Sequence, residues 1–198
     1  LDRFADLVDE STEVVTVTGM SNVLGVRPDL HAISHLARAV GATVVVDGAQ
    51  LVPHQPVSVG ELDIDALAFG AHKMLGPTGI GALWMRPELA ESIEPFETGG
   101  EMIRDVTIDG ATWAPNPAKF EAGTPPITQA IGFAAAVDYL TDLGMDEVAA
   151  HEAELTATAI ARLTDEVAGV TVMGPGPAPD RGGRSEEHTS ELQSPLCI

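Results

Sequence analysis

Positively charged residues are scarce in this sequence of 198 residues. It contains 10 Lys and Arg against 30 Asp and Glu, which gives a formal net charge of −20. Proteins that bind nucleic acid need a basic patch or stripe to neutralise phosphates, so this composition argues against a nucleic-acid partner. It fits a surface that is kept soluble by negative charge, as in halophilic proteins. The hydrophobic content of 44% argues against disorder caused by charge.

Cysteine and long apolar runs are also missing. The only cysteine is Cys197, so a disulfide framework is excluded and a reducing compartment is the default expectation. No apolar run approaches the length that is needed to span a bilayer. The segment that begins at Leu1 has no secretory signal pattern. These absences predict a cytoplasmic protein with no membrane partner.

The last residues do not follow the pattern of the rest. After Gly174, prolines alternate with Gly, Ala and Asp, which predicts a loop or linker. From Arg184 the sequence reads RSEEHTSELQSPLCI, without apolar periodicity. Residues 184–194 match, without a gap, the translation of a common short-read sequencing adapter. We therefore predict that residues 175–198 are a linker and a non-native tail, and that Cys197 carries no function.

Hydrophobic periodicity predicts alternating strands and helices. A strand over 13–18, a helix over 28–40 and a strand over 42–46 form a β-α-β unit, which implies parallel strands with a right-handed crossover. The fold class is therefore α/β, with a mostly parallel sheet and flanking helices. The further predicted elements are strands over 62–69, 81–85 and 170–173, helices over 2–10, 87–93, 128–143 and from 145 onward, and an irregular or hairpin-like stretch over 96–117.

The last two predicted helices carry apolar residues at helical spacing, and we expect these residues to face inward. They are Ile131, Ala135, Val137, Tyr139 and Leu140 in the first helix and Val148, Leu155, Ile160, Leu163 and Val167 in the second.

Residues 66–85 place little side-chain bulk around one lysine. An apolar run ends at Gly70, His72 and Lys73 follow, and several glycines precede the next apolar run. This order predicts a strand, a tight polar loop and a second strand. Glycines let a ligand approach the backbone closely. Because only two lysines occur in the chain, the place of Lys73 in this loop indicates a specific task, whereas we interpret Lys119 as a surface or hairpin lysine.

Other kinds of site lack their required pattern. A P-loop needs a lysine after its glycines and a helix behind it, whereas Lys73 precedes the glycines and a strand follows. A dinucleotide fingerprint needs G-x-G-x-x-G between a strand and a helix, and the glycines here have another order. His31 and His35 have helical spacing, but no carboxylate cluster completes a metal site, so we interpret them as surface histidines. Ser21 lacks the G-x-S-x-G elbow of a hydrolase nucleophile.

A covalent role for the Lys73 amine remains. Lysine forms a Schiff base when its amine can lose its proton, and enzymes that use pyridoxal phosphate (PLP) also need a carboxylate opposite the pyridinium nitrogen. Asp47 ends a buried parallel strand, where α/β folds bind ligands, and Gln50 follows three residues later. From position alone, a turn or helix cap is an equally good interpretation of Asp47. His72 and the loop amides can donate hydrogen bonds to a phosphate.

The order of these motifs resembles a known family. DGAQ at 47–50, AHKMLGPTGIG at 71–81 and FEAGTP at 120–125 resemble the fold-type I PLP enzymes of aminotransferase class V. SNVLG at 21–25 is similar to the Suf-type cysteine desulfurases within that class. The resemblance covers residues 14–175.

The resemblance implies a role for residues around the PLP ring. Lys73 would form the Schiff base, and Asp47 would keep the ring nitrogen protonated. Gln50 and Asn22 would hydrogen-bond near the ring hydroxyl. It also implies that residues 1–144 are an incomplete PLP-binding large domain and that residues 145–174 begin a small C-terminal domain.

The phosphate group would have two side-chain contacts. His72 would contact it directly, and Thr124 would reach the phosphate of the partner subunit's cofactor, which implies a homodimer. One departure concerns Gly70, because the family usually has a serine there as a phosphate ligand. Loop amides or a water molecule could replace that hydroxyl.

The activity that the resemblance implies is removal of sulfur from L-cysteine, which leaves L-alanine and a persulfide. The sulfur would pass to an acceptor protein of iron–sulfur cluster assembly. The family's persulfide-forming cysteine, an upstream histidine and a downstream arginine have no counterpart in this sequence, so we expect an inactive fragment. The alternatives are another class V enzyme, such as a kynureninase or a small-substrate aminotransferase, or a non-catalytic fragment that binds no cofactor.

Overall fold

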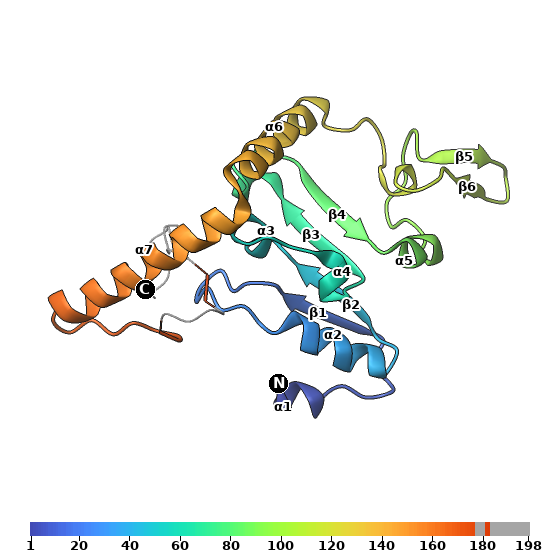
Figure 1. Ribbon diagram of the computed structural model, residues 1–198. Coiled ribbons are helices and arrows are strands. Elements are labelled where there is room, and N and C mark those ends of the chain that lie inside the picture. The colour runs from blue at the N-terminus through green and yellow to red at the C-terminus, as the bar shows by residue number, and fades with distance from the viewer. Residues whose placement is uncertain (177–180, 183–198) are drawn as a thin grey trace.

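A four-stranded sheet organises the chain, of which the computed structural model describes residues 1–176 and 181–182 (Figure 1). Its strands are β1 (Val14–Thr18), β2 (Thr43–Asp47), β3 (Ala66–Gly70) and β4 (Gly81–Met85), adjacent in that order. β1, β2 and β3 are parallel, whereas β4 runs antiparallel to β3. The predicted mostly parallel sheet is therefore confirmed.

One face of the sheet forms the core. The crossover helix α2 (Leu30–Ala39) begins where the Asp29 side chain accepts a hydrogen bond from the Ala32 amide at 2.9 Å, as an N-cap does. Its buried residues Leu30, Ile33 and Ala37 have helical spacing and pack against this face. The short helices α3 (Leu51–His54) and α4 (Val59–Leu62) complete the cover. The strand residues in the core are Val15, Val44, Val46 and Leu67.

The opposite face of the sheet is open in the described chain. Successive strand side chains point to opposite faces, so the neighbours of the core residues lie on this side. Val14 and Leu83 are 54% and 55% exposed, and Asp47 and Ala68 are also exposed. This face carries apolar and small residues without a covering layer.

Residues 87–120 leave the sheet and return. They contain α5 (Pro87–Ser92), the antiparallel pair β5 (Ile103–Val106) and β6 (Ala111–Trp113), and the 3-10 turn η2 (Ala118–Phe120). Figure 1 shows the β5–β6 hairpin projecting away from the sheet, on the side opposite to α7. The predicted short helix and hairpin-like stretch are confirmed.

Two long helices follow, α6 (Ile127–Leu143) and α7 (Met145–Glu166). Gly144 separates them with a φ of +87°, a conformation that favours glycine. α6 lies against the sheet, where Phe133 meets Phe69 edge-on with ring centroids 6.3 Å apart. α7 extends away from the sheet (Figure 1).

The burial predicted for these helices is largely wrong. In α6, Leu140 is buried as expected, but Ile131 and Tyr139 are 69% and 59% exposed, and Ala135 and Val137 are exposed too. α6 is apolar on most of its circumference, so periodicity could not identify the side that packs. α7 extends beyond the sheet and has no fully buried residue. Leu155 and the adjacent Val167 are 55% and 45% exposed, so the prediction is wrong for them, whereas Val148, Ile160 and Leu163 are half-buried.

Three further predicted elements differ from the structure, one because it does not form and two because their boundaries lie elsewhere. No strand forms over residues 170–173, which have no neighbouring strand to pair with in the described chain. β3 begins at Ala66 rather than at 62, because a turn precedes it in which Asp63 has a φ of +52°. The first helix, α1 (Asp2–Ala5), is shorter than the predicted helix over 2–10.

Within residues 1–176 and 181–182, no helix combines the length and the apolar character that crossing a bilayer requires. The predicted non-native tail from Arg184, including Cys197, lies outside the described residues.

Candidate functional site

The carboxyl ends of the three parallel strands form one edge of the sheet, and most of the predicted site residues lie there. Asp47 is the last residue of β2, and Asn22 lies in the loop after β1. The 3-10 turn η1 (Ala71–Lys73) follows β3 directly. Parallel strands end on the same edge, which is where open α/β sheets bind ligands. The topology therefore brings together residues that are far apart in the sequence.

Asp47 has both a local structural bond and an unused oxygen. Its Oδ1 accepts a hydrogen bond from the Ala49 amide at 2.9 Å, which is the turn-capping role considered above. The side chain is exposed on the open face of the sheet. Within the described residues, its Oδ2 makes no hydrogen bond. The cap and a ligand contact are therefore compatible.

The turn after Asp47 is closely packed. A Cβ at Gly48 would lie 2.7 Å from Cδ1 of Leu67, so only glycine fits there without a shift. The Gly48 amide donates to the Ala68 carbonyl at 2.8 Å. Gln50, at the start of α3, is only 4% exposed. The DGAQ sequence thus forms a closely packed turn between β2 and α3, next to β3.

His72 and Lys73 lie in η1, directly after β3. His72 is exposed and Lys73 is half-buried. Among residues 1–176 and 181–182, no hydrogen bond or ion pair involves the Lys73 amine. A Cβ at Gly70 would lie 3.2 Å from Nδ1 of His72, so the imidazole lies over the position where other residues would have a side chain. The missing side chain at Gly70 and the placement of His72 are therefore linked.

An open cavity of about 450 Å³ lies at this edge. Its lining includes Asp47, Ala49, Ala68, Gly70, Gly81 and Leu83. A Cβ at Gly81 would lie 2.7 Å from the Phe69 carbonyl oxygen, because β3 and β4 pair closely through Gly70 and Gly81. Small residues thus line the floor, and the acidic group of Asp47 lies beside them.

Thr124 lies apart from the other predicted residues. It is exposed in the turn that precedes α6. In the part of the chain that the structure describes, no hydrogen bond joins it to Asp47, His72 or Lys73. The loop after Lys73 instead contacts α6, where a Cβ at Gly132 would lie 3.2 Å from Pro77. Thr124 as a contact to a partner subunit's cofactor stays a prediction.

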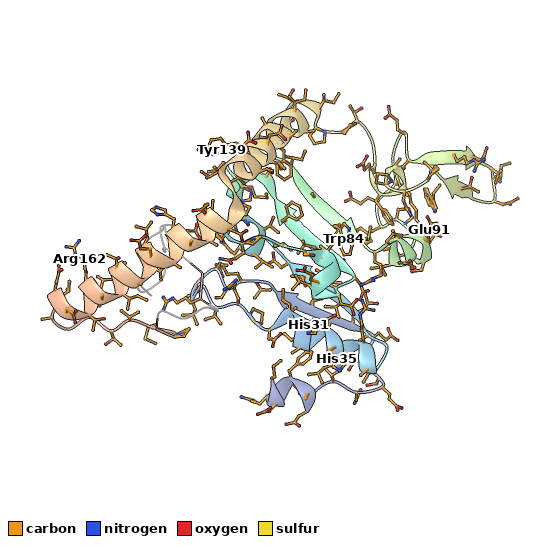
Figure 2. The ribbon with its side chains drawn as sticks, viewed as in Figure 1. His31, His35, Trp84, Glu91, Tyr139 and Arg162 are labelled. Carbon is orange, nitrogen blue, oxygen red and sulfur yellow. The ribbon has the colours of Figure 1, made fainter. Side chains whose placement is uncertain are left out.

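The two histidines of α2 are surface residues, as predicted. His31 and His35 are exposed on this helix (Figure 2). Among the described residues, no group of three or more His, Cys, Asp or Glu side chains could hold a metal ion.

Lys119 is not the surface residue that the sequence suggested. Its side chain is 7% exposed, and its Nζ donates to the Ala90 carbonyl at 2.9 Å. The prediction of a surface or hairpin lysine is therefore wrong. The scarcity of lysine, which singled out Lys73, applied equally to Lys119 and was the signal that could have revealed it.

Comparisons with known proteins agree with the motifs. The family model for aminotransferase class-V matches residues 1–186. A probable cysteine desulfurase of Streptomyces coelicolor is 48% identical over 182 residues, which are 92% of this chain and 43% of that protein. A cysteine desulfurase of Haloferax volcanii is 49% identical over 183 residues, or 92% of this chain and 42% of the relative.

A solved structure shows the same fold. The apo cysteine desulfurase from Thermococcus onnurineus superposes with a TM-score of 0.84 at 36% identity, over 90% of this chain and 44% of that one. The chain therefore spans less than half the length of these relatives. The predicted fold class and the resemblance to cysteine desulfurases of class V are confirmed, and the individual site residues remain predictions.

Proposed function

Because this chain belongs to the aminotransferase class-V family, we propose that it is the PLP-binding part of a cysteine desulfurase. That enzyme would take sulfur from L-cysteine and leave L-alanine. One observation carries the proposal. The sheet brings Asp47, the His72-Lys73 turn and Asn22 to one edge, in a chain 48% and 49% identical to relatives named as cysteine desulfurases.

The residues at this edge fit PLP in their chemistry. Lys73 supplies an amine that could hold the cofactor covalently, and Asp47 supplies a carboxylate with one unused oxygen for the ring nitrogen. Gln50 and Asn22 supply amide groups for the ring hydroxyl. The cavity of about 450 Å³ is lined by Asp47, Phe69, Leu83 and several glycines and alanines, and these small residues leave room for a flat ring.

When bound, PLP would supply an electron-withdrawing ring for reactions at the α-carbon of an amino acid. The chain's own residues would set the conditions for that chemistry. Asp47 would keep a proton on the ring nitrogen, because a nearby carboxylate favours the charged form of a cation. Lys73 would move a proton at the substrate α-carbon. His72, over Gly70, would donate a hydrogen bond to the phosphate.

We further propose a homodimer, a sulfur-acceptor protein and a cytoplasmic location for the intact protein. Support for the homodimer comes from the exposure of Thr124, which is predicted to serve a partner subunit, and from the outward apolar residues Ile131 and Tyr139 of α6. Exposed apolar patches of this kind mark interaction surfaces. Since the chain spans 43% of the length of the Streptomyces relative, we expect it to bind PLP without releasing alanine from L-cysteine.

Covalent trapping tests the proposal. The purified chain is incubated with PLP, reduced with borohydride and digested, and the modified peptide is identified by mass spectrometry. We expect the label on Lys73, with Lys119 as an internal control because it is the other lysine and is buried. Lys73→Ala should lose the label. A label on Lys119 or Leu1 alone, or none at all, would contradict the proposal.

A further inference from the structure

Lys119 is a buried cation that the proposed chemistry does not use. A lysine is almost never fully buried unless it is paired. Its Nζ donates to the carbonyl oxygens of Ala90 at 2.9 Å and Glu91 at 3.4 Å, and lies 5.2 Å from the centre of the Phe120 ring. Among the described residues, no carboxylate forms an ion pair with it. Its partners are backbone oxygens at the end of α5, which carry the partial negative charge of the helix.

Two neighbouring side chains contact the end of α5 and the residues just after it. Asn116 Nδ2 donates to Oε1 of Glu91 at 2.8 Å, and the Trp113 indole N–H donates to the Glu94 carboxylate. Figure 2 labels Glu91 on α5, beside the returning chain. Asn116 and Lys119 therefore contact α5 itself, and Trp113 contacts Glu94 just beyond it; of these three side chains Lys119 is the buried one.

α5 is in turn fixed to the sheet. Arg86 directly precedes it, and the Arg86 amide donates to the Asp65 carbonyl at 2.8 Å. The Arg86 guanidinium forms ion pairs with Asp63 at 2.8 Å and Asp65 at 3.0 Å. A continuous set of polar contacts thus leads from the sheet through α5 to Lys119.

The turn that carries Thr124 follows Lys119 at once. The Glu121 amide donates to the Ala118 carbonyl at 3.1 Å, and the Gly123 amide donates to the Gly100 carbonyl at 2.9 Å. The first bond ties the turn to η2, which Lys119 holds, and the second ties it to the segment between α5 and β5. Thr124 itself is exposed, so its position depends on this attachment.

We propose that Lys119 is a positioning residue, whose amine holds η2 to the end of α5 and thereby fixes residues 121–125 and Thr124. This attachment of η2 to α5 through the Lys119 amine, here called the clamp, rests on the contacts described above. The part that assigns Thr124 to phosphate recognition rests on the proposed function.

Hydrogen exchange tests the clamp directly. Lys119→Met removes the donor, and losing a hydrogen bond from a charged group should speed amide exchange over residues 118–125 about tenfold. Lys119→Arg should restore most of the protection, because guanidinium can donate to the same carbonyls. Lys73→Met is the matched control and should leave this segment unchanged. Unchanged exchange in Lys119→Met would overturn the proposal.

Strands β1 and β2 serve as an internal reference. If amide exchange in β1 and β2 also becomes fast in Lys119→Met, that variant has lost its fold, and Lys119→Gln, which keeps a polar side chain but removes the charge, is measured instead. That variant should speed exchange in 118–125 alone, and an equal change in both regions would contradict a local clamp.

Cofactor binding tests the link to Thr124. PLP and pyridoxal differ in the phosphate, so in the proposed homodimer a displaced Thr124 should lower the affinity for PLP about tenfold and leave that for pyridoxal unchanged. The double variant Lys119→Met/Thr124→Val should bind PLP no more weakly than Thr124→Val alone. A loosened turn with an unchanged ratio of the two affinities would overturn the link to the phosphate. If the unmodified chain binds neither compound, the proposed function fails, whereas the exchange result still decides the clamp.

Discussion

Both ends of the central sheet carry charged side chains. Within the described residues, these side chains form ion pairs at one end and remain without ion pairs at the other. At the amino-terminal end of the parallel strands, Arg38 and Arg86 each pair with Asp63 and Asp65 at 2.7–3.0 Å. Oδ2 of Asp65 accepts a hydrogen bond from the buried Val44 amide at 2.8 Å. These charges satisfy one another and join α2, β2, β3 and β4.

At the carboxyl-terminal end, the charged groups remain available. Within the described residues, the Asp47 side chain accepts a hydrogen bond only from the Ala49 amide, two residues later, and the Lys73 amine has no ion pair. Closed charge networks stabilise a fold, whereas unpaired charged groups at a ligand-binding edge can act on a ligand, and Asp47 lines the open cavity there. The difference between the two ends indicates which charges serve stability and which serve function.

Removing the centre of the closed network should have the largest effect. Asp65→Ala leaves the buried Val44 amide without its acceptor and removes one of the two carboxylates that pair with Arg38 and Arg86. Breaking a buried pair lowers stability by about 3–5 kcal/mol. Because Arg38 and Arg86 are 35% and 33% exposed, we expect the lower part of this range, about 3 kcal/mol. Urea unfolding measures the change.

The matched control is Asp109→Ala, in the exposed turn of the β5–β6 hairpin. It removes one carboxylate that has no partner among the described residues, so its free energy of unfolding should change by less than about 0.5 kcal/mol. Equal losses in the two variants would show that net charge, rather than the network, governs stability in this acidic chain.

An intermediate effect is expected where a single pair joins α3 to α7. Nδ1 of His54 and Oε1 of Glu152 lie 2.8 Å apart, and both side chains are about one-fifth exposed. Glu152→Ala removes this pair, and the loss of about 1 kcal/mol should speed amide exchange in α7 about fivefold. Glu154→Ala, on an exposed part of the same helix, is the control. The same acceleration in both would mean that the pair does not hold α7.

Much of the fold and the order of the site could be predicted because the signals are local. The crossover from β1 through α2 to β2 follows from an N-capping Asp29, helical spacing and an apolar strand. The turn after β2 follows from Asp47, a residue type that commonly begins turns, and its Oδ1 accepts the Ala49 amide there. The edge where Asp47 and Lys73 lie then follows from parallel topology alone.

The remaining features depend on contacts between distant segments. The ion-pair network at the amino-terminal end of the parallel strands links Arg38 with Arg86 through Asp63 and Asp65. These two aspartates lie in residues 62–65, for which the sequence alone predicted a strand. Lys119 is buried by α5, some thirty residues earlier in the chain. The packed side of α6 is set by Phe69 and the sheet, which helical periodicity does not identify.

The smallest effect on stability is expected at the open end. Asp47→Asn keeps an oxygen that can accept the Ala49 amide, and the side chain is exposed, so the free energy of unfolding should change by less than about 0.5 kcal/mol. The same change removes the carboxylate for the ring nitrogen, so affinity for PLP should fall about tenfold. Urea unfolding and a PLP titration of one preparation measure both quantities. A loss of stability as large as that of Asp65→Ala would mean that Asp47 also serves the fold, and the two ends of the sheet would no longer differ in role.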